Sequence, residues 1–313
     1  MKLKTLGIAA ITAITALAPF TVQAEYPEKP VSFVVPWPPG DLADITTRII
    51  ADEFQAAYGV ASAVLNKPGG GGGPFPGAVY VAEQPADGYT VGALVNAIPA
   101  FGDQVGIPQL NPNPFEPLGI YLTYPFVIAA RKDLPFSTVA ELASYSQANP
   151  VVFGHFGAKL LPTRAALALA KTTGITFASD AAFDALDCNT LASGDVDVMT
   201  VTVQTILPCM DNVTVLATFG DTRLAAAPDA PAVTELVPDL NLSLWNGLFV
   251  HKDTPQDVRD KITEVAKRAV ESERMQDIAT QTGALIKWAT KEDAEARITS
   301  DKAALAKINE LLQ

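Results

Sequence analysis

The chain has 313 residues, of which 49% are hydrophobic, and its formal net charge at neutral pH is −12. An acidic balance of this size argues against nucleic acid and against anionic lipid as partners. The length is sufficient for two lobes, each with a core of its own.

The first 24 residues have the pattern of a cleaved secretory signal peptide. Lys2 and Lys4 precede an apolar run from Leu6 to Leu17, and Val22-Gln23-Ala24 offers small or neutral residues at a cleavage point. The run is shorter than the roughly 20 residues that a spanning helix needs, so a membrane anchor is the weaker interpretation. We therefore predict a mature chain that begins near Glu25 and is exported to the periplasm.

A strand, a stiff loop and a helix open the predicted mature chain. The apolar segment from Val31 to Val35 runs into Pro36-Trp37-Pro38-Pro39-Gly40, whose prolines restrict the backbone. Asp44 is placed to cap the helix that follows, and Gly59 is placed to end it. A helix N-terminus at the carboxyl end of a strand is where α/β proteins bind anions, so this segment predicts an anion site.

Five consecutive glycines, Gly69 to Gly73, follow the segment Asn66-Lys67-Pro68. Such a tract lets main-chain N–H groups approach a ligand closely. No Lys-Ser or Lys-Thr follows it, and the spacing Gly-x-Gly-x-x-Gly is absent, which excludes a nucleotide-binding fingerprint. A flexible surface loop remains the alternative interpretation of the tract.

Strand and helix patterns alternate along the rest of the chain. They comprise strands over 61–65, ending at Val95, and over 124–130, 151–153, 196–201, 213–218 and 242–250, an irregular excursion over 102–117, a helix over 163–171, and helical patterns from Thr254 to Leu312. Thr138-x-x-Glu141 and Thr290-x-x-Asp293 have the spacing of capping boxes, so each is expected to start a helix. This alternation predicts mostly parallel sheets with helices on both faces. A change of domain is expected near Tyr124, where a new strand and helix series begins.

The chain has two cysteines, Cys188 and Cys209, and two histidines, His155 and His251. An even pair in an exported protein is compatible with one disulfide, although two separate buried thiols remain an alternative. Nothing in the sequence ties either histidine to a thiol. Because zinc-ligand, calcium-loop and Gly-x-Ser-x-Gly patterns are absent too, we predict no metal, no cofactor and no catalytic residue.

Several short motifs run in order over nearly the whole predicted mature chain. They are Tyr26-Pro27-x-Lys29-Pro30, Val35-Pro36-Trp37-Pro38-Pro39-Gly40 with Asp44, Asn66-Lys67-Pro68-Gly69, Ala86-Asp87-Gly88-Tyr89-Thr90, Asp195-Val196-Asp197, Arg223 with Pro228-Asp229-Ala230-Pro231, and Trp245-Asn246-Gly247-Leu248-Phe249. In this order the chain resembles the periplasmic solute receptors of tripartite tricarboxylate transporters, also called Bug proteins.

The resemblance implies a two-lobe periplasmic binding protein fold, type II-like, with residues 25–123 and 249–313 in lobe 1 and 124–248 in lobe 2. It also implies a monomeric receptor that binds a small organic carboxylate between the lobes and delivers it to the membrane permease subunits of a tripartite transporter. A periplasmic enzyme acting on such an acid, or a ligand-binding partner of a sensor kinase, are the alternatives.

In the resembling family, main-chain N–H groups of two loops hold the carboxylate. The corresponding predicted ligand-binding residues of these loops are Trp37, Pro38, Pro39, Gly40, Asp41, Asp44, His155, Phe156, Gly157, Ala158 and Lys159. Thr202 and Thr205 lie where the resemblance implies a further wall of the pocket. Asp41 departs from the family, which commonly has glycine there, and it would either repel a ligand carboxylate or pair with a cation, hydroxyl or amino group. His155 and Lys159 are candidate substitute donors, against a locally bonded histidine and a solvated lysine.

Overall fold

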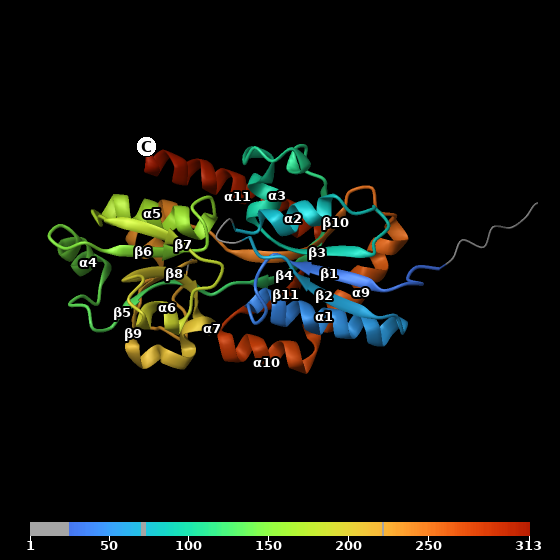
Figure 1. Cartoon of the computed structure of the whole chain (residues 1–313), viewed down its shortest axis with the longest axis horizontal. Coiled ribbons are helices and arrows are strands. Elements are labelled where there is room, and N and C mark those ends of the chain that lie inside the picture. Colours follow the sequence, from blue (N-terminus) through green and yellow to red (C-terminus); the bar gives the residue numbers. More distant parts are fainter. Residues whose placement is uncertain (1–24, 70–72, 221) are drawn as a thin grey trace, which may run out of the picture.

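The computed structural model describes residues 25–69, 73–220 and 222–313, and the predicted signal peptide and the middle of the glycine tract lie outside these ranges. Two sheets form two lobes that lie side by side (Figure 1). The first sheet has the order β11-β4-β10-β3-β1-β2 and the second β7-β6-β8-β5-β9. The strands are β1 (Val31–Val35), β2 (Ser62–Asn66), β3 (Thr90–Val95), β4 (Phe115–Thr123), β5 (Phe126–Arg131), β6 (Val152–His155), β7 (Ser179–Ala182), β8 (Val198–Thr202), β9 (Val213–Thr218), β10 (Trp245–His251) and β11 (Leu285–Ala289).

The predicted two-lobe α/β fold is confirmed, but both sheets are mixed rather than mostly parallel. Strand β1 is parallel to β2 and β3, and β6 is parallel to β7 and β8. In contrast, β10 runs antiparallel to β3 and β4, and β5 runs antiparallel to β8 and β9. Parallel neighbours need a crossover within one lobe. Strand β10 instead arrives from the other lobe and enters the first sheet from the opposite end.

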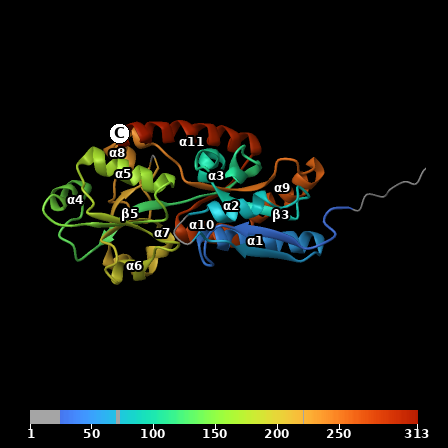
Figure 2. The same ribbon diagram turned by 45° about the horizontal axis from the view of Figure 1, so that its top comes forward.

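Helices cover the sheets and join the lobes. They are α1 (Leu42–Tyr58), α2 (Phe75–Ala82), α3 (Ala97–Phe101), α4 (Val139–Ser146), α5 (Leu161–Thr173), α6 (Cys188–Ala192), α7 (Val203–Ile206), α8 (Val233–Leu236), α9 (Gln256–Glu271), α10 (Glu273–Thr282) and α11 (Lys291–Leu312), with 3-10 segments at Gly102–Gln104, Pro108–Leu110, Leu207–Asn212 and Pro238–Leu240. Figure 2 shows α11 lying along both lobes. It contacts α3 and β4 in one lobe and α5 in the other, so it bridges them.

Helix α1 begins three residues earlier than predicted, because Asp41 and not Asp44 is its N-cap. The Asp41 backbone is extended, and its Oδ1 accepts a hydrogen bond from the Ala43 amide at 2.8 Å. Gly59 ends the helix as predicted, in the left-handed conformation with φ +70°. The early start brings Leu42 and Ala43 into the core, where both are fully buried.

Aromatic packing fixes α1 against the opening strand. Phe54 is fully buried, with its ring centroid 5.8 Å from Phe33 on β1 and 6.3 Å from Tyr26, in edge-to-face geometry. Such pairs add about 0.5–1.5 kcal/mol to the free energy gained from burial alone. The loop between β1 and α1 is therefore held at both of its ends.

Three strands were not predicted, and β4 is the most informative of them. It lies between β10 and β11, although Pro117 and Gly119 interrupt its sequence. Register shifts occur along its pairing with β10, which accommodates residues that a regular ladder disfavours. A Cβ at Gly119 would lie 2.3 Å from Trp288, so close packing of β11 requires glycine there.

Among the described helices, none combines the length and apolar composition that crossing a bilayer requires.

Candidate ligand-binding site

A pocket lies between the two lobes and has about 480 Å³ of space free of protein atoms when the adjoining open solvent is included. The lining combines residues of both sheets and of the segments that connect them: Trp37, Asp41, Val95, Asn96, Ala97, Tyr124, Phe126, Phe156, Leu160, Leu161, Pro162, Thr202, Leu244 and Trp245. The described lining contains neither lysine nor arginine.

Aromatic rings form a continuous wall across the junction of the lobes. The ring centroids of Trp37 and Phe156 are 5.8 Å apart, those of Phe156 and Phe126 6.1 Å, and those of Phe126 and Tyr124 5.7 Å. Trp37 comes from the loop after β1, whereas Phe156 follows β6. The contact between them holds the lobes together over the pocket and gives it an apolar surface suited to a carbon skeleton.

Asp41 contributes a carboxylate to this apolar lining. It is partly buried, and removal from water raises its pKa to about 6, helped by repulsion from Asp44 and opposed by the backbone amides of Ala43 and Leu42. No side chain of the described residues donates a hydrogen bond to it. The hydrogen bond from the Ala43 amide thus occupies one oxygen, and among the described residues no cation is paired with the carboxylate.

Tyr124 places a second polar group at the same pocket. Its side chain is 8% exposed, and its hydroxyl is buried without a hydrogen-bond partner among the described residues. Burial raises the pKa of Tyr124 well above its usual value, and the negative charge of Asp41 raises it further. The hydroxyl therefore stays protonated and lies within electrostatic reach of Asp41.

Asp44 lies outside the pocket lining and holds the loop that carries Trp37. Its Oδ2 accepts hydrogen bonds from the Gly40 amide at 2.9 Å and Arg48 Nε at 3.0 Å, and its Oδ1 accepts from Arg48 Nη2 and Asn66 Nδ2, both at 2.8 Å. Burial by itself raises the pKa of Asp44, but these hydrogen bonds outweigh it and lower the pKa. Asn66 also donates to the Trp37 carbonyl at 2.9 Å, a role that sequence analysis did not identify.

His155 is also buried away from the lining and stabilises the second predicted loop. Its Nδ1 accepts from the Gly157 amide at 2.9 Å, so the proton lies on Nε2, which is 2.8 Å from Asp180 Oδ2. The Gly157 amide is thereby used within the protein. Ala158 and Lys159 are exposed and lie outside the lining, whereas Phe156 lies within it.

The remaining predicted residues divide between the lining and its support. Thr202 lies in the lining at the end of β8, and its Oγ1 accepts from Gln204 Nε2 at 2.6 Å. Thr205 lies outside it and donates to the Thr202 carbonyl at 3.0 Å. Pro38, Pro39 and Gly40 also lie outside the lining, because the loop turns toward solvent after Trp37.

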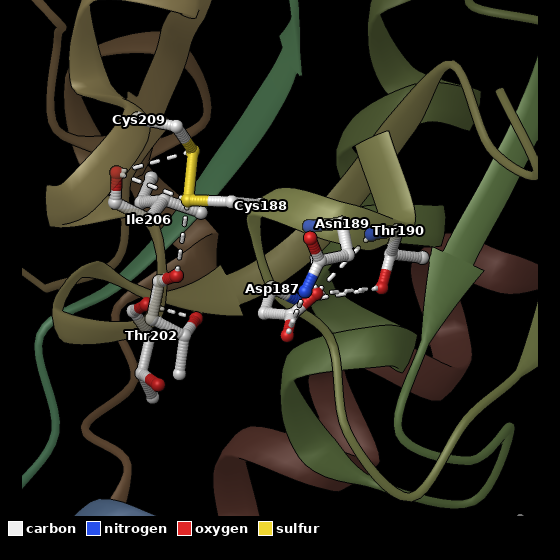
Figure 3. Close-up of a disulfide and its surroundings, with 8 residues drawn as sticks. Asp187, Cys188, Asn189, Thr190, Thr202, Ile206 and Cys209 are labelled. Atoms are coloured by element: carbon white, nitrogen blue, oxygen red, sulfur yellow. Dashed lines mark hydrogen bonds between the residues drawn. A yellow bond between two sulfur atoms is a disulfide. The ribbon is translucent and has the colours of Figure 1, made fainter. Parts of the chain in front are cut away.

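A disulfide supports the segment that leaves Thr202. Cys188, the first residue of α6, is bonded to Cys209, with their Cα atoms 5.8 Å apart. Figure 3 shows Thr202 and Ile206 on the same side of this bond. Asp187 caps α6 by accepting from the Asn189 amide at 2.8 Å, and Cys209 lies in the 3-10 segment Leu207–Asn212.

The start of α5 supplies main-chain donors at the pocket. Its N-cap, Leu160, gives no side-chain hydrogen bond to the first turn, and Pro162 has no N–H. The amides of Leu161 and Thr163 therefore have no intrahelical acceptor. The hydroxyl of Thr163 is likewise buried and unpartnered among the described residues. With the helix dipole, these donors favour a negative charge.

Sequence analysis missed most of the lining that comes from outside the two loops. The missed residues are Val95, Asn96, Ala97, Tyr124, Phe126, Leu160, Leu161, Pro162, Leu244 and Trp245. Several of these residues lie at strand ends or at the junctions between the lobes. A position at a predicted strand end is the sequence feature that could have identified them as lining residues. Within the described ranges, no group of acidic, histidine or cysteine side chains is arranged to hold a metal ion.

Comparison with known proteins gives a consistent assignment. A family model described as the tripartite tricarboxylate transporter family receptor matches residues 46–312. Protein BugT of Bordetella pertussis is 25% identical, covering 96% of this chain and 93% of the relative. The structure of the periplasmic binding protein BugD is 25% identical and covers 91% of this chain and 98% of that one, with a TM-score of 0.79.

Two further structures are similar in fold and contain organic acids. Rpa4515 of R. palustris with adipate is 21% identical and covers 92% of this chain and 98% of that one, with a TM-score of 0.80. MatC from Rhodopseudomonas palustris with bound malate is 22% identical and covers 89% of this chain and 99% of that one, with a TM-score of 0.76.

Proposed function

Because the chain belongs to the tripartite tricarboxylate transporter receptor family, we propose that it binds a small organic carboxylate between its lobes and delivers it to a transporter of that kind. The observation that carries the proposal is the pocket, whose lining comes from both lobes. A ligand there contacts both lobes at once and stabilises the closed form, which a permease can distinguish from the open form.

The start of α5 is the proposed anion subsite. Leu161 lies in the lining, and the amides of Leu161 and Thr163 have no intrahelical acceptor. A carboxylate at this helix start would accept from main-chain donors in a water-poor pocket, where such hydrogen bonds are strong. Adipate and malate in the two similar structures are carboxylates too, which supports the same ligand class here.

The proposed setting is the periplasm, after removal of residues 1–24, and the proposed state is a monomer with permease subunits as partners. The lobe boundaries predicted from sequence, near residues 124 and 249, are retained in this proposal. The receptor has no covalent chemistry to perform: its work is to close on the acid and to release it at the membrane.

The test is binding of a panel of mono-, di- and tricarboxylates to the purified protein. Trp37 and Trp245 line the pocket, so their fluorescence reports occupancy. A ligand at about 100 times its Kd should also stabilise the folded protein by about 2.7 kcal/mol, seen as a thermal shift. Absence of any saturable response from folded protein would contradict the proposal.

Two matched substitutions locate the site. Ala97 is 2% exposed and lies in the lining, so Ala97→Trp should fill the pocket and abolish binding. Ala158 is exposed outside the lining, so Ala158→Trp should retain the parent affinity. Circular dichroism confirms that both variants fold. Loss of binding in Ala158→Trp alone would place the ligand at the exposed loop and not in the pocket.

A further inference from the structure

We propose that Asp41 and the Tyr124 hydroxyl form a subsite for an amino group, so that the ligand is a zwitterionic amino acid with an apolar skeleton and not a plain dicarboxylate. The inference rests on the proposed function, since it places a second ligand group in the same pocket. It concerns the residue at which this chain differs from the glycine common in the resembling family.

The first support is the unbalanced charge of Asp41. The carboxylate lies in the lining, and its Oδ1 accepts a hydrogen bond from the Ala43 amide at 2.8 Å. The described lining contains no lysine or arginine that could balance its charge. A ligand carboxylate beside it would add a second negative charge in a poorly hydrated space. An ammonium would instead form a charge-assisted hydrogen bond and restore neutrality.

The second support is independent of Asp41. The Tyr124 hydroxyl is buried and has no partner among the described residues, although its residue lines the pocket. A buried hydroxyl without a partner is costly, by about 1–3 kcal/mol. Its oxygen can accept one N–H of an ammonium whose other N–H bonds to Asp41, because an ammonium has three donors.

The third support is the composition of the rest of the lining. Trp37, Phe126 and Phe156 surround the pocket with aromatic surface, and the start of α5 is the proposed carboxylate position. The other uncapped helix start in the described lining, at Ala97, belongs to α3, which has only five residues. One anion subsite, one cation subsite and apolar walls together fit an amino acid with a hydrocarbon body. A dicarboxylate ligand would instead place one of its two carboxylates beside Asp41.

Matched ligand pairs separate the two classes, because each pair differs only in one terminal group. The pairs are adipate with 6-aminohexanoate and benzylmalonate with phenylalanine, and binding of each is followed by tryptophan fluorescence and calorimetry. We expect at least one amino member to bind at least tenfold more tightly than its dicarboxylate. Tighter binding of the dicarboxylate in both pairs overturns the inference and leaves the proposed function standing. No binding of any carboxylate in the wider panel overturns both.

Substitutions then assign the effect to the subsite. Asp41→Asn keeps a good helix cap, since asparagine caps as well as aspartate, and it should weaken the amino ligand at least tenfold while leaving or improving the dicarboxylate. Tyr124→Phe removes only the hydroxyl and should weaken the amino ligand about threefold to tenfold. Asp253→Asn is the charge control. Asp253 is exposed and follows β10 at the end of the strand opposite Trp245. Unchanged amino-ligand affinity in Asp41→Asn refutes the assignment.

The pH dependence distinguishes an ionised Asp41 from a protonated one. Asp44, Tyr121 and Tyr124 are the titratable groups that act on Asp41, and Asp44 is already paired with Arg48. If Asp41 accepts from an ammonium, affinity rises as pH increases through about 6. A fall over the same range would mean that protonated Asp41 donates to a ligand carboxylate, which contradicts the proposal. Asp41→Asn should abolish the dependence in either case.

Discussion

Asp301 on α11 is a buried carboxylate whose replacement tests how the C-terminal helix holds the pocket. Its side chain is nearly inaccessible, and its Oδ2 accepts from Trp245 Nε1 at 2.8 Å and from Asn96 Nδ2 at 3.0 Å. Both donors belong to residues of the pocket lining. The perturbation is Asp301→Asn, which retains an oxygen acceptor of the same shape and removes the charge.

The expected magnitude follows from the pKa. Burial raises the pKa of Asp301 from 3.8 to about 6, against the opposing effect of hydrogen bonds from Asn96 and Trp245. One pKa unit corresponds to about 1.4 kcal/mol, so the ionised carboxylate lowers the free energy of unfolding by about 3 kcal/mol. Between pH 4 and 6 the folded state binds more protons than the unfolded state, so stability falls as pH rises through this window and is constant above it.

Urea denaturation at pH 4 and at pH 7.5 measures the effect. The free energy of unfolding of Asp301→Asn, relative to that of the parent, should rise by about 3 kcal/mol from pH 4 to pH 7.5, because residue 301 ionises only in the parent. Asp301→Leu is the control: it removes the acceptor, leaves two buried donors unpaired, and should lower stability by about 1–3 kcal/mol or more at both pH values. An equal difference between parent and Asp301→Asn at the two pH values would refute the reasoning.

Two other predictions concern the support of the pocket. Cys188 and Cys209 close a loop with a sequence separation of 21 residues, so replacing both by alanine should lower the free energy of unfolding by about 3 kcal/mol. Denaturation without reductant measures this difference. An unchanged midpoint and slope would contradict the prediction. Asp44→Ala removes the acceptor of the Gly40 and Arg48 donors and should cost about 2 kcal/mol and weaken ligand binding. Arg48→Ala is its control, since it leaves the Gly40 bond intact and should affect binding less.

The order of elements around the pocket was predictable because it depends on local patterns. Prolines and a glycine after an apolar strand mark the first loop, and Thr138 and Thr290 cap their helices as their spacing indicates. The roles of Asp41 and Asp44 were not predictable in this way. They are separated by less than one helical turn, and the partner that fixes Asp44 is Asn66 on β2.

The position of His155 could not be predicted either, because it depends on a contact with a residue that is distant in the sequence. A histidine in a glycine-rich loop suggests a donor for an anion, and the motif alone gives no reason to turn it inward. The deciding contact is with Asp180 on β7, a strand that periodicity did not indicate because it is short and half polar. Tertiary pairing therefore converts a candidate ligand contact into a support for the Gly157 amide.

Asp41 and Asp301 have raised pKa values for the same reason, burial, but a ligand can compensate only one of them. Asp41 faces the pocket, so an ammonium that pairs with it removes its unfavourable charge on binding. Asp301 is enclosed behind Trp245 and Asn96 and gains nothing from the ligand. The stability that a saturating amino ligand adds should therefore grow with pH through about 6, and this growth should persist in Asp301→Asn and disappear in Asp41→Asn. The pH dependence of the free protein's stability thus reports on both carboxylates, whereas that of binding reports on Asp41 alone.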